Sequence, residues 1–393
     1  MRRPLTLVAA GACALVSAMA IGRFAYTPLL PYMQRDMGLS ITAAGYLASA
    51  NFLGYLAGAL LAMRIGPGRR DAAFVGGLAL SVLTTFAMAF IEAGGAQAVA
   101  RALSGLASAF VLIQGSAIVL DGVLRAGRAS AFPLIYSGVG IGIALSAGLV
   151  QWLAASGADA PAMWLAFGAL AGILAVPALA LRGTMPNAAA NQTSVATPAP
   201  PPPAAARRAL GWLTAAYGSL GFGYVITMTF IVVIVRGRPE WQRYEMIVWM
   251  CVGFAGVPSN PLWGRLARRL DPWRAMSAAF VLEAIGVAAA VSGAHIGLVM
   301  LGGALLGGTF LAITALGLST GRQLAQGDSG PTVARLTAAF GVGQILGPAI
   351  GGWIAERTGS FVLPSALAAL TLLAAAVMIE VSRRYHGTLG RGR

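Results

Sequence analysis

Long uninterrupted runs of hydrophobic residues follow one another along almost the whole chain. Twelve such runs, each of about 20 residues, alternate with short polar segments. Because a run in contact with lipid must satisfy its own backbone hydrogen bonds, each is predicted to form a transmembrane helix. Strands of a membrane barrel would be shorter and would alternate apolar with polar residues. The predicted spans cover residues 5–33, 41–63, 72–92, 97–120, 130–154, 161–182, 210–235, 245–264, 275–293, 295–318, 333–355 and 361–382.

The first run also has features of a cleavable signal. Arg2 and Arg3 precede it, and residues 18–20 (Ala-Met-Ala) resemble a signal-peptidase site. The hydrophobic run continues past that site to Met33, so we interpret it as the first transmembrane helix, with a cleaved signal as the alternative.

The composition is typical of a membrane protein. Hydrophobic residues make up 58% of the chain and charged residues 10%, whereas a soluble domain has about 25% charged residues. The net charge is +15, but the basic residues, all Arg, lie in short loops, which argues against nucleic acid as a partner. Cys13 and Cys251 lie far apart in apolar runs and the chain has only two His, so neither a metal site nor a cofactor is expected.

The distribution of Arg predicts which side of the membrane each loop faces. With the N-terminus placed inside, 20 of the 27 Arg residues fall in inside loops, five in outside loops, and two, Arg23 and Arg101, within spans. Since cytoplasmic loops carry an excess of basic residues, both termini are predicted to be cytoplasmic, in a bacterial inner membrane. The loop at 236–243, with three Arg outside, is an exception.

A segment of different composition separates the sixth and seventh spans. Residues 183–209 contain four consecutive Pro amid Ala, Asn, Gln and Thr, which is typical of a flexible or polyproline-like linker. This cytoplasmic linker divides the chain into an N-terminal six-helix bundle at 1–182 and a C-terminal six-helix bundle at 210–393.

Short sequence matches indicate that the two halves are repeats. Residues 22–26 match 221–224, and two further matches in the fourth and tenth and in the fifth and eleventh spans have similar offsets, 198 to 203 residues overall. Transporters often consist of two such repeats, with the solute site near the middle of the membrane between them.

Two segments carry a resemblance to a known family. They are residues 21–31 in the first span, Ile-Gly-Arg-Phe-Ala-Tyr-Thr-Pro-Leu-Leu-Pro, and residues 221–230 in the seventh. Both resemble transporters of the major facilitator superfamily, in its YbfB/YjiJ-type branch, and the resemblance covers the chain except the linker and the tail. It implies an all-α membrane protein of twelve transmembrane helices, in the two pseudo-symmetric six-helix bundles of the major facilitator fold.

The loop after the second span keeps part of a family motif. Arg64 and Arg69 match the basic positions of G-x-x-x-D-R-x-G-R-R, but the acidic residue is missing. The resemblance implies that these Arg residues gate or cap cytoplasmic helix ends, with Asp121 as a partner. In the eleventh span, Gly343, Gly347 and Pro348 belong to a run similar to the G-x-x-x-G-P-x-x-G-G element of antiporters, which normally lies on the fifth helix. We expect a gating or structural role for these residues too.

The two Arg residues within spans are the main candidates for solute binding. Arg23 lies about 27 Å along the first predicted helix, where a charge must be paired or hydrated to persist. The resemblance turns the first, fourth, seventh and tenth spans toward a central cavity, so Arg23 and Arg101 would face an anionic solute there. The alternatives are a local cap on backbone carbonyls for Arg23 and an extended side chain reaching the membrane surface for Arg101.

Other polar and aromatic residues within spans are weaker candidates, since each is more often a helix-packing residue than a ligand contact. Tyr26 and Tyr224 are stronger candidates for solute contact than the others, because the repeat places them at equivalent positions in the two halves. The wider set is Tyr26, Asn51, Tyr55, Gln114, Tyr136, Tyr217, Tyr224, Thr309 and Gln344. From these we select Tyr26, Gln114, Tyr224 and Thr309 as substrate-binding candidates beside Arg23 and Arg101.

Glu283 is the one acidic residue deep in an apolar run, and it is the candidate for proton coupling. A structural role in a neutral form is the alternative, because the family places the ninth helix at the periphery.

The function favoured by these features is secondary active transport of a small solute by alternating access, with an organic anion or carboxylate-bearing metabolite favoured and a proton as the coupling ion. An efflux antiporter for drugs or metabolites is the main alternative. An enzyme or receptor is a remote one, because the spans offer no cluster of catalytic residues and the loops no soluble domain. We expect a monomer whose partners are the solute and the lipid bilayer.

The predicted orientation can be tested with reporter fusions. Fusions after Asn187 and at the C-terminus should both report a cytoplasmic location, because the Arg-rich loops remain inside. A periplasmic location at either point would contradict the twelve-span prediction.

Overall fold

The computed structural model describes residues 4–92, 94–183, 203–325 and 329–390. Within these ranges the chain forms helices and no strands, and twelve helices are long and apolar enough to cross a membrane. The twelve predicted spans are therefore confirmed. Most of the predicted linker, residues 184–202, lies outside the described residues, as do Arg2 and Arg3.

The spans of the N-terminal half are formed by α1 (Pro4–Leu15), η1 (Val16–Phe24), α2 (Tyr26–Met37), α3 (Ile41–Ala62), α4 (Arg70–Ala87), α5 (Gly95–Arg125), α6 (Ser137–Ala155) and α7 (Ala160–Ala178). Those of the C-terminal half are α8 (Ala204–Arg236), α9 (Glu245–Leu270), α10 (Pro272–Val291), α11 (Ile296–Leu324), α12 (Gly330–Thr358) and α13 (Val362–Gly390). Short helical turns cover Pro67–Arg69 (η2), Ala129–Tyr136 (η3), Leu179–Leu181 (η4) and Pro239–Tyr244 (η5).

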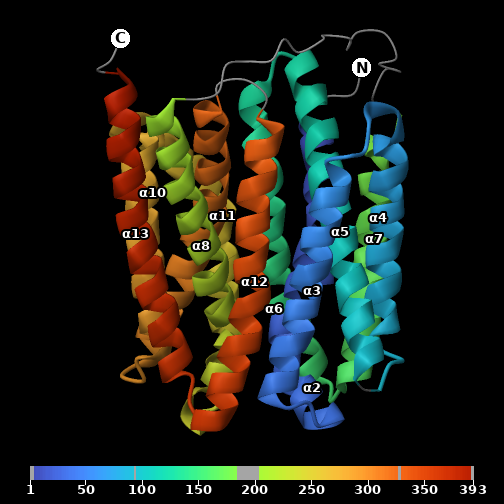
Figure 1. Ribbon diagram of the computed structural model, residues 1–393. Helices are drawn as coiled ribbons and strands as arrows, with labels where there is room; N and C mark the ends of the chain where they lie inside the picture. The colour runs from blue at the N-terminus through green and yellow to red at the C-terminus, as the bar shows by residue number, and fades with distance from the viewer. Residues whose placement is uncertain (1–3, 93, 184–202, 326–328, 391–393) are drawn as a thin grey trace.

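The helices of each half gather on their own side of the molecule, and the two groups meet along two seams (Figure 1). One seam joins α3 to α12 and the other joins α6 to α9. Small residues let the backbones touch there, as in other membrane bundles. A Cβ atom on Gly45 would overlap the carbonyl oxygen of Pro348, and one on Gly140 would lie 2.6 Å from the carbonyl oxygen of Gly253.

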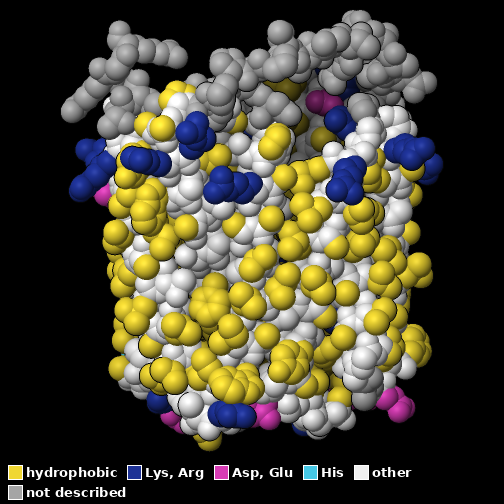
Figure 2. Space-filling view, viewed as in Figure 1, with side chains coloured by type: hydrophobic (Ala, Val, Ile, Leu, Met, Phe, Trp, Pro, Cys, Tyr) yellow, Lys and Arg dark blue, Asp and Glu magenta, His cyan; other side chains and the backbone are white. Residues whose placement is uncertain are grey.

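Helix α1 begins and helix α13 ends on one side of the bundle, which we call the terminal side (Figure 1). Figure 2 shows a broad hydrophobic band with basic side chains gathered above and below it, and more of them toward the terminal side. Large apolar side chains such as Phe90 and Trp152 are exposed on the molecule. Such a surface belongs in lipid, so the chain is a multi-pass membrane protein.

The first span differs from the regular helix that the sequence predicts. Its middle part, η1, is a π-helix of nine residues that ends at Phe24, and α2 resumes the α-helix at Tyr26. π-helical segments are rare and are frequent at functional sites. The wider turn changes which residues share a face, and so determines where Arg23 and Tyr26 lie.

The seventh span also begins earlier than predicted. Helix α8 starts at Ala204, inside the segment 183–209 that we interpreted as linker. Three consecutive Ala residues open this helix, and Ala has the highest helix propensity, so the helix continues beyond the apolar run.

Candidate functional site

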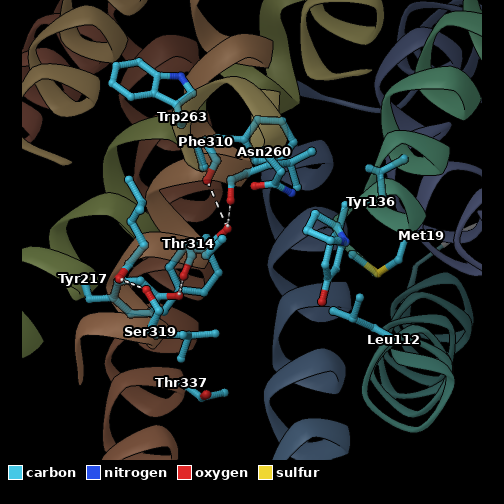
Figure 3. Close-up of a pocket in the computed structure, with 18 of the residues that line it drawn as sticks. Met19, Leu112, Tyr136, Tyr217, Asn260, Trp263, Phe310, Thr314, Ser319 and Thr337 are labelled. Atoms are coloured by element: carbon cyan, nitrogen blue, oxygen red, sulfur yellow. Dashed lines mark hydrogen bonds between the residues drawn. The ribbon is translucent and has the colours of Figure 1, made fainter. Parts of the chain in front are cut away.

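A cavity of about 460 Å³ lies between the two halves of the molecule. Figure 3 shows Met19, Leu112 and Tyr136 of the N-terminal half facing Tyr217, Phe310 and other residues of the C-terminal half across it. The lining extends from Arg23, in the interior of the first span, toward the terminal-side ends of α9 and α11, at Trp263 and Arg322. A volume of this size is typical of sites for small organic molecules.

Arg23 is the charged group at the deep end of the cavity. Its side chain is only 5% exposed, and the guanidinium carbon lies 4.2 Å from the ring centre of Tyr55 and 4.5 Å from that of Phe52. Its Nε atom is buried without a hydrogen-bond partner, and no carboxylate of the described residues forms an ion pair with it. Aromatic faces stabilise the cation only in part, so Arg23 retains the capacity to bind an anion.

Arg101, on α5, binds the backbone of the π-helix η1 that carries Arg23. Its two terminal nitrogens donate to the carbonyl oxygens of Gly22 (3.0 Å) and Arg23 (3.2 Å), and Ser104 donates to Gly22 as well (2.7 Å). The guanidinium also lies 4.6 Å from the ring centre of Tyr26. Arg101 therefore satisfies carbonyls of η1 and fixes the backbone that carries the Arg23 side chain.

Aromatic side chains form much of the rest of the lining. Tyr224 stacks on Phe310 and on Phe340, with ring centres 5.5 and 5.9 Å apart, and Gln344 donates to its hydroxyl group (2.5 Å). The charged residues in the lining are Arg23 and Arg322, and no Asp or Glu of the described residues contributes to it. The cavity is thus apolar, aromatic and positively charged.

Beyond Arg23, on the side opposite to the termini, the halves are joined by polar contacts. Tyr32 donates to a carboxylate oxygen of Glu245 (3.3 Å), and Arg236 pairs with the same carboxylate. The backbone N–H of Thr42 donates to Glu356 (2.6 Å). The cavity lining lies entirely on the terminal side of these contacts, so the described conformation directs the site toward the terminal side.

Comparison with protein families identifies the chain. A profile described as "Uncharacterised MFS-type transporter YbfB" matches residues 15–380, nearly the whole chain. The protein belongs to this family of the major facilitator superfamily. A comparison with curated protein sequences gave no match.

Two crystal structures of the nucleoside transporter NupG have the same fold as this YbfB-family chain. That of a NupG point mutant has a TM-score of 0.73 and 14% sequence identity, over 96% of this chain and 99% of the other. A second NupG structure has a TM-score of 0.71 and 15% identity, over 98% and 100%. At this identity the likeness extends to the major facilitator fold alone.

Of the six predicted substrate-binding residues, Arg23 and Tyr224 line the cavity of this YbfB-family member and four do not. Arg101 caps backbone carbonyls, as described above. The Tyr26 hydroxyl donates to the carbonyl of Ala44 (2.9 Å), and the residue is not part of the cavity lining. The other two side chains are also bonded to backbone: Gln114 donates to Ala62 (3.0 Å) and Thr309 to Leu305 (2.7 Å).

The predicted gating and structural residues occupy helix ends and crossings. Asp121 pairs with Arg70 (3.5 Å), whereas Arg64 and Arg69 are exposed. Residues Gly343 and Gly347 allow α12 to touch α8, since a Cβ atom on either would overlap atoms of that helix. Pro348 lies at the seam with α3, against Gly45.

Glu283 is fully buried in α10, and neither of its carboxylate oxygens has a hydrogen-bond partner among the described residues. It does not line the cavity.

Several lining residues escaped the sequence analysis, among them Phe310, Phe340, Trp263 and Arg322. An aromatic residue in an apolar helix has the same pattern whether it packs in the core or borders a cavity. The sequence analysis counted Arg322 among the Arg residues of the inside loops. Only the structure shows that the end of α11, which carries Arg322, lies beside the cavity.

The capping role of Arg101 can be tested by Arg101→Met. We expect it to lower the free energy of unfolding by about 1–3 kcal/mol, because the buried Arg23 carbonyl loses a charged donor. The measurement is the melting temperature of the purified protein in detergent. The control is Arg384→Met, whose side chain is 77% exposed. If both variants melt at the temperature of the unaltered protein, Arg101 does not support η1.

Proposed function

We propose that this transporter-family protein is a secondary active transporter for small organic anions, which it moves by alternating access. The observation that carries the proposal is the buried guanidinium of Arg23 at the deep end of the cavity, whose Nε atom has no hydrogen-bond partner and which forms no ion pair with a carboxylate of the described residues. A bound carboxylate would supply the two parallel hydrogen bonds and the negative charge that this group lacks.

The charges around the cavity favour an anion over a cation. Arg322 stands near the mouth and Arg23 at the deep end, and no acidic residue of the described chain faces the solute between them. Electrostatic interactions are strengthened in a partly dry site, so a cationic solute would be repelled along its whole path.

Efflux of drugs or other apolar metabolites is the second candidate, since most of the lining is aromatic or aliphatic. NupG, which has the same fold, transports nucleosides, and a nucleoside is a neutral solute with many hydroxyl groups. Polar side chains such as Asn260, Thr314 and Ser319 could bind hydroxyl groups of such a solute, but a neutral solute would leave the charge of Arg23 without a negative partner.

The proposed setting is a bacterial inner membrane with both termini and the linker in the cytoplasm. The excess of Arg in the loops of the terminal side supports this orientation. In that orientation the cavity faces the cytoplasm. We further propose that residues 1–182 and residues 210–393 move as two six-helix bundles, and that the monomer is the working unit. The first turns of α8, at 204–209, lie outside these two ranges.

The first test is substitution of Arg23. Arg23→Ala should abolish uptake of the anion into proteoliposomes while the protein still folds, and Arg23→Lys should weaken binding about tenfold, because Lys keeps the charge but loses the planar fork. Arg357→Ala, an exposed residue on the opposite side, is the control. Normal transport by Arg23→Ala, or a cationic solute, would contradict the proposal.

Coupling to a proton gradient is proposed to depend on Glu283. Burying an ionised carboxylate without a partner is costly, so gain and loss of a proton there would accompany a change in its surroundings. Such a linkage is what a coupled transporter requires between ion binding and alternating access.

Glu283→Gln tests this role, because Gln has the same shape and carries no titratable proton. We expect normal expression and solute binding, but uptake that no longer responds to an imposed pH gradient. The exposed Glu240→Gln serves as the control. Unchanged pH dependence in Glu283→Gln would assign Glu283 to a structural role.

A further inference from the structure

One wall of the cavity is a row of aromatic rings with nearly parallel planes. The ring planes of Tyr224 and Phe310 differ by 9° and those of Tyr224 and Phe340 by 3°. These residues come from α8, α11 and α12, so three different helices contribute to one surface. All three rings line the cavity.

The row continues at both ends. Toward the terminal side, Tyr217 packs against Phe340 with ring centres 5.2 Å apart. In the other direction, Phe24 meets Phe310 edge to face at 6.1 Å, and the Arg23 guanidinium carbon lies 5.3 Å from the Phe24 ring. The row therefore begins beside the cation and extends along α8 from Tyr224 to Tyr217, about 10 Å at 1.5 Å per residue.

The facing wall is mixed, with Tyr136 beside aliphatic side chains. Met19 and Leu112 lie across the cavity from the row, as Figure 3 shows, and offer flexible aliphatic surface. A flat ring placed between the walls would contact aromatic faces or edges on one side and adaptable Met and Leu side chains on the other. An aliphatic body of equal size would gain the hydrophobic contribution alone.

We propose that the solute is an aryl carboxylate, whose carboxylate binds Arg23 and whose aromatic ring packs along the row formed by Phe310, Tyr224, Phe340 and Tyr217. This inference rests on the proposed function and adds the chemical class of the solute's body. Phe24 joins the two parts of the site, since it directly follows Arg23 in the chain and contacts Phe310. Arg23 supplies charge selection and the row supplies selection for a planar ring.

Three probes of similar shape separate these contributions: 3-phenylpropionate, 3-cyclohexylpropionate and the neutral 3-phenylpropionamide. Binding is measured with the purified full-length protein in detergent, by calorimetry. We expect the phenyl acid to bind about three- to tenfold more tightly than the cyclohexyl acid, the gain typical of aromatic pairs beyond their area. The amide should bind at least about tenfold more weakly than the phenyl acid.

Variants assign the preference to the row. Phe340→Leu should reduce the ratio of the two acid affinities to about one, whereas Phe90→Leu, on the outer surface with 74% exposure, should leave it unchanged. Phe310→Leu is measured in parallel, so that the test stands if Phe340→Leu fails to fold. Arg23→Gln should weaken both acids equally and leave their ratio intact.

The outcomes distinguish this inference from the proposed function. If the two acids bind equally well and both bind better than the amide, the aromatic preference is overturned and anion transport stands. If the amide binds as tightly as the phenyl acid, anion recognition fails, and the aryl carboxylate assignment fails with it. If the ratio of the acids is unchanged in Phe340→Leu and Phe310→Leu, the row is not the site of ring recognition.

Discussion

A positive charge without a negative partner, held in the middle of an apolar bundle, is the constraint around which this site is organised. Among the described residues no carboxylate reaches Arg23, and aromatic rings of α3 lie against it instead. Such a charge is costly in a membrane unless water or a ligand reaches it. The cavity between the halves is therefore a condition for Arg23 to be tolerated, as well as the space in which a solute would bind.

Arg101, the second cation within a span, is stabilised in a different way. Arg101 is equally buried, but both of its terminal nitrogens donate to backbone carbonyls, those of Gly22 and Arg23, and only its Nε atom has no partner among the described residues. The Arg101 guanidinium thus holds the backbone of η1 by hydrogen bonds. The Arg23 side chain, which that backbone carries, lines the cavity. Two Arg residues that look alike in the sequence have different roles for this reason, and a ligand would meet only one of them.

Much of the fold could be predicted from the sequence, because twelve apolar runs leave helix as the only backbone that lipid permits. Arg23 could be found because a deep charge is rare, and Tyr224 because the repeat pairs it with Tyr26. Which residues line the cavity could not be predicted where rotation about a helix axis decides the outcome. The Tyr26 hydroxyl bonds to the carbonyl of Ala44, and the Thr309 hydroxyl bonds to its own helix while the adjacent Phe310 lines the cavity. Runs that are apolar on all sides carry no periodicity from which such rotations can be derived.

Contacts on the side of the bundle opposite to the terminal side involve one of the three Arg residues that form the exception in the Arg distribution. Arg236 pairs with Glu245, and its guanidinium carbon lies 4.2 Å from the ring centre of Tyr32, which belongs to the other half. This Arg is retained on the Arg-poor side because it joins the halves there. A transporter that alternates its access has to separate them at this point. The hydrogen bond from Tyr32 to the Glu245 carboxylate crosses between the halves. One hydrogen bond to a charged group contributes about 1.5–3 kcal/mol, so this contact can close the site and still be broken when the solute crosses.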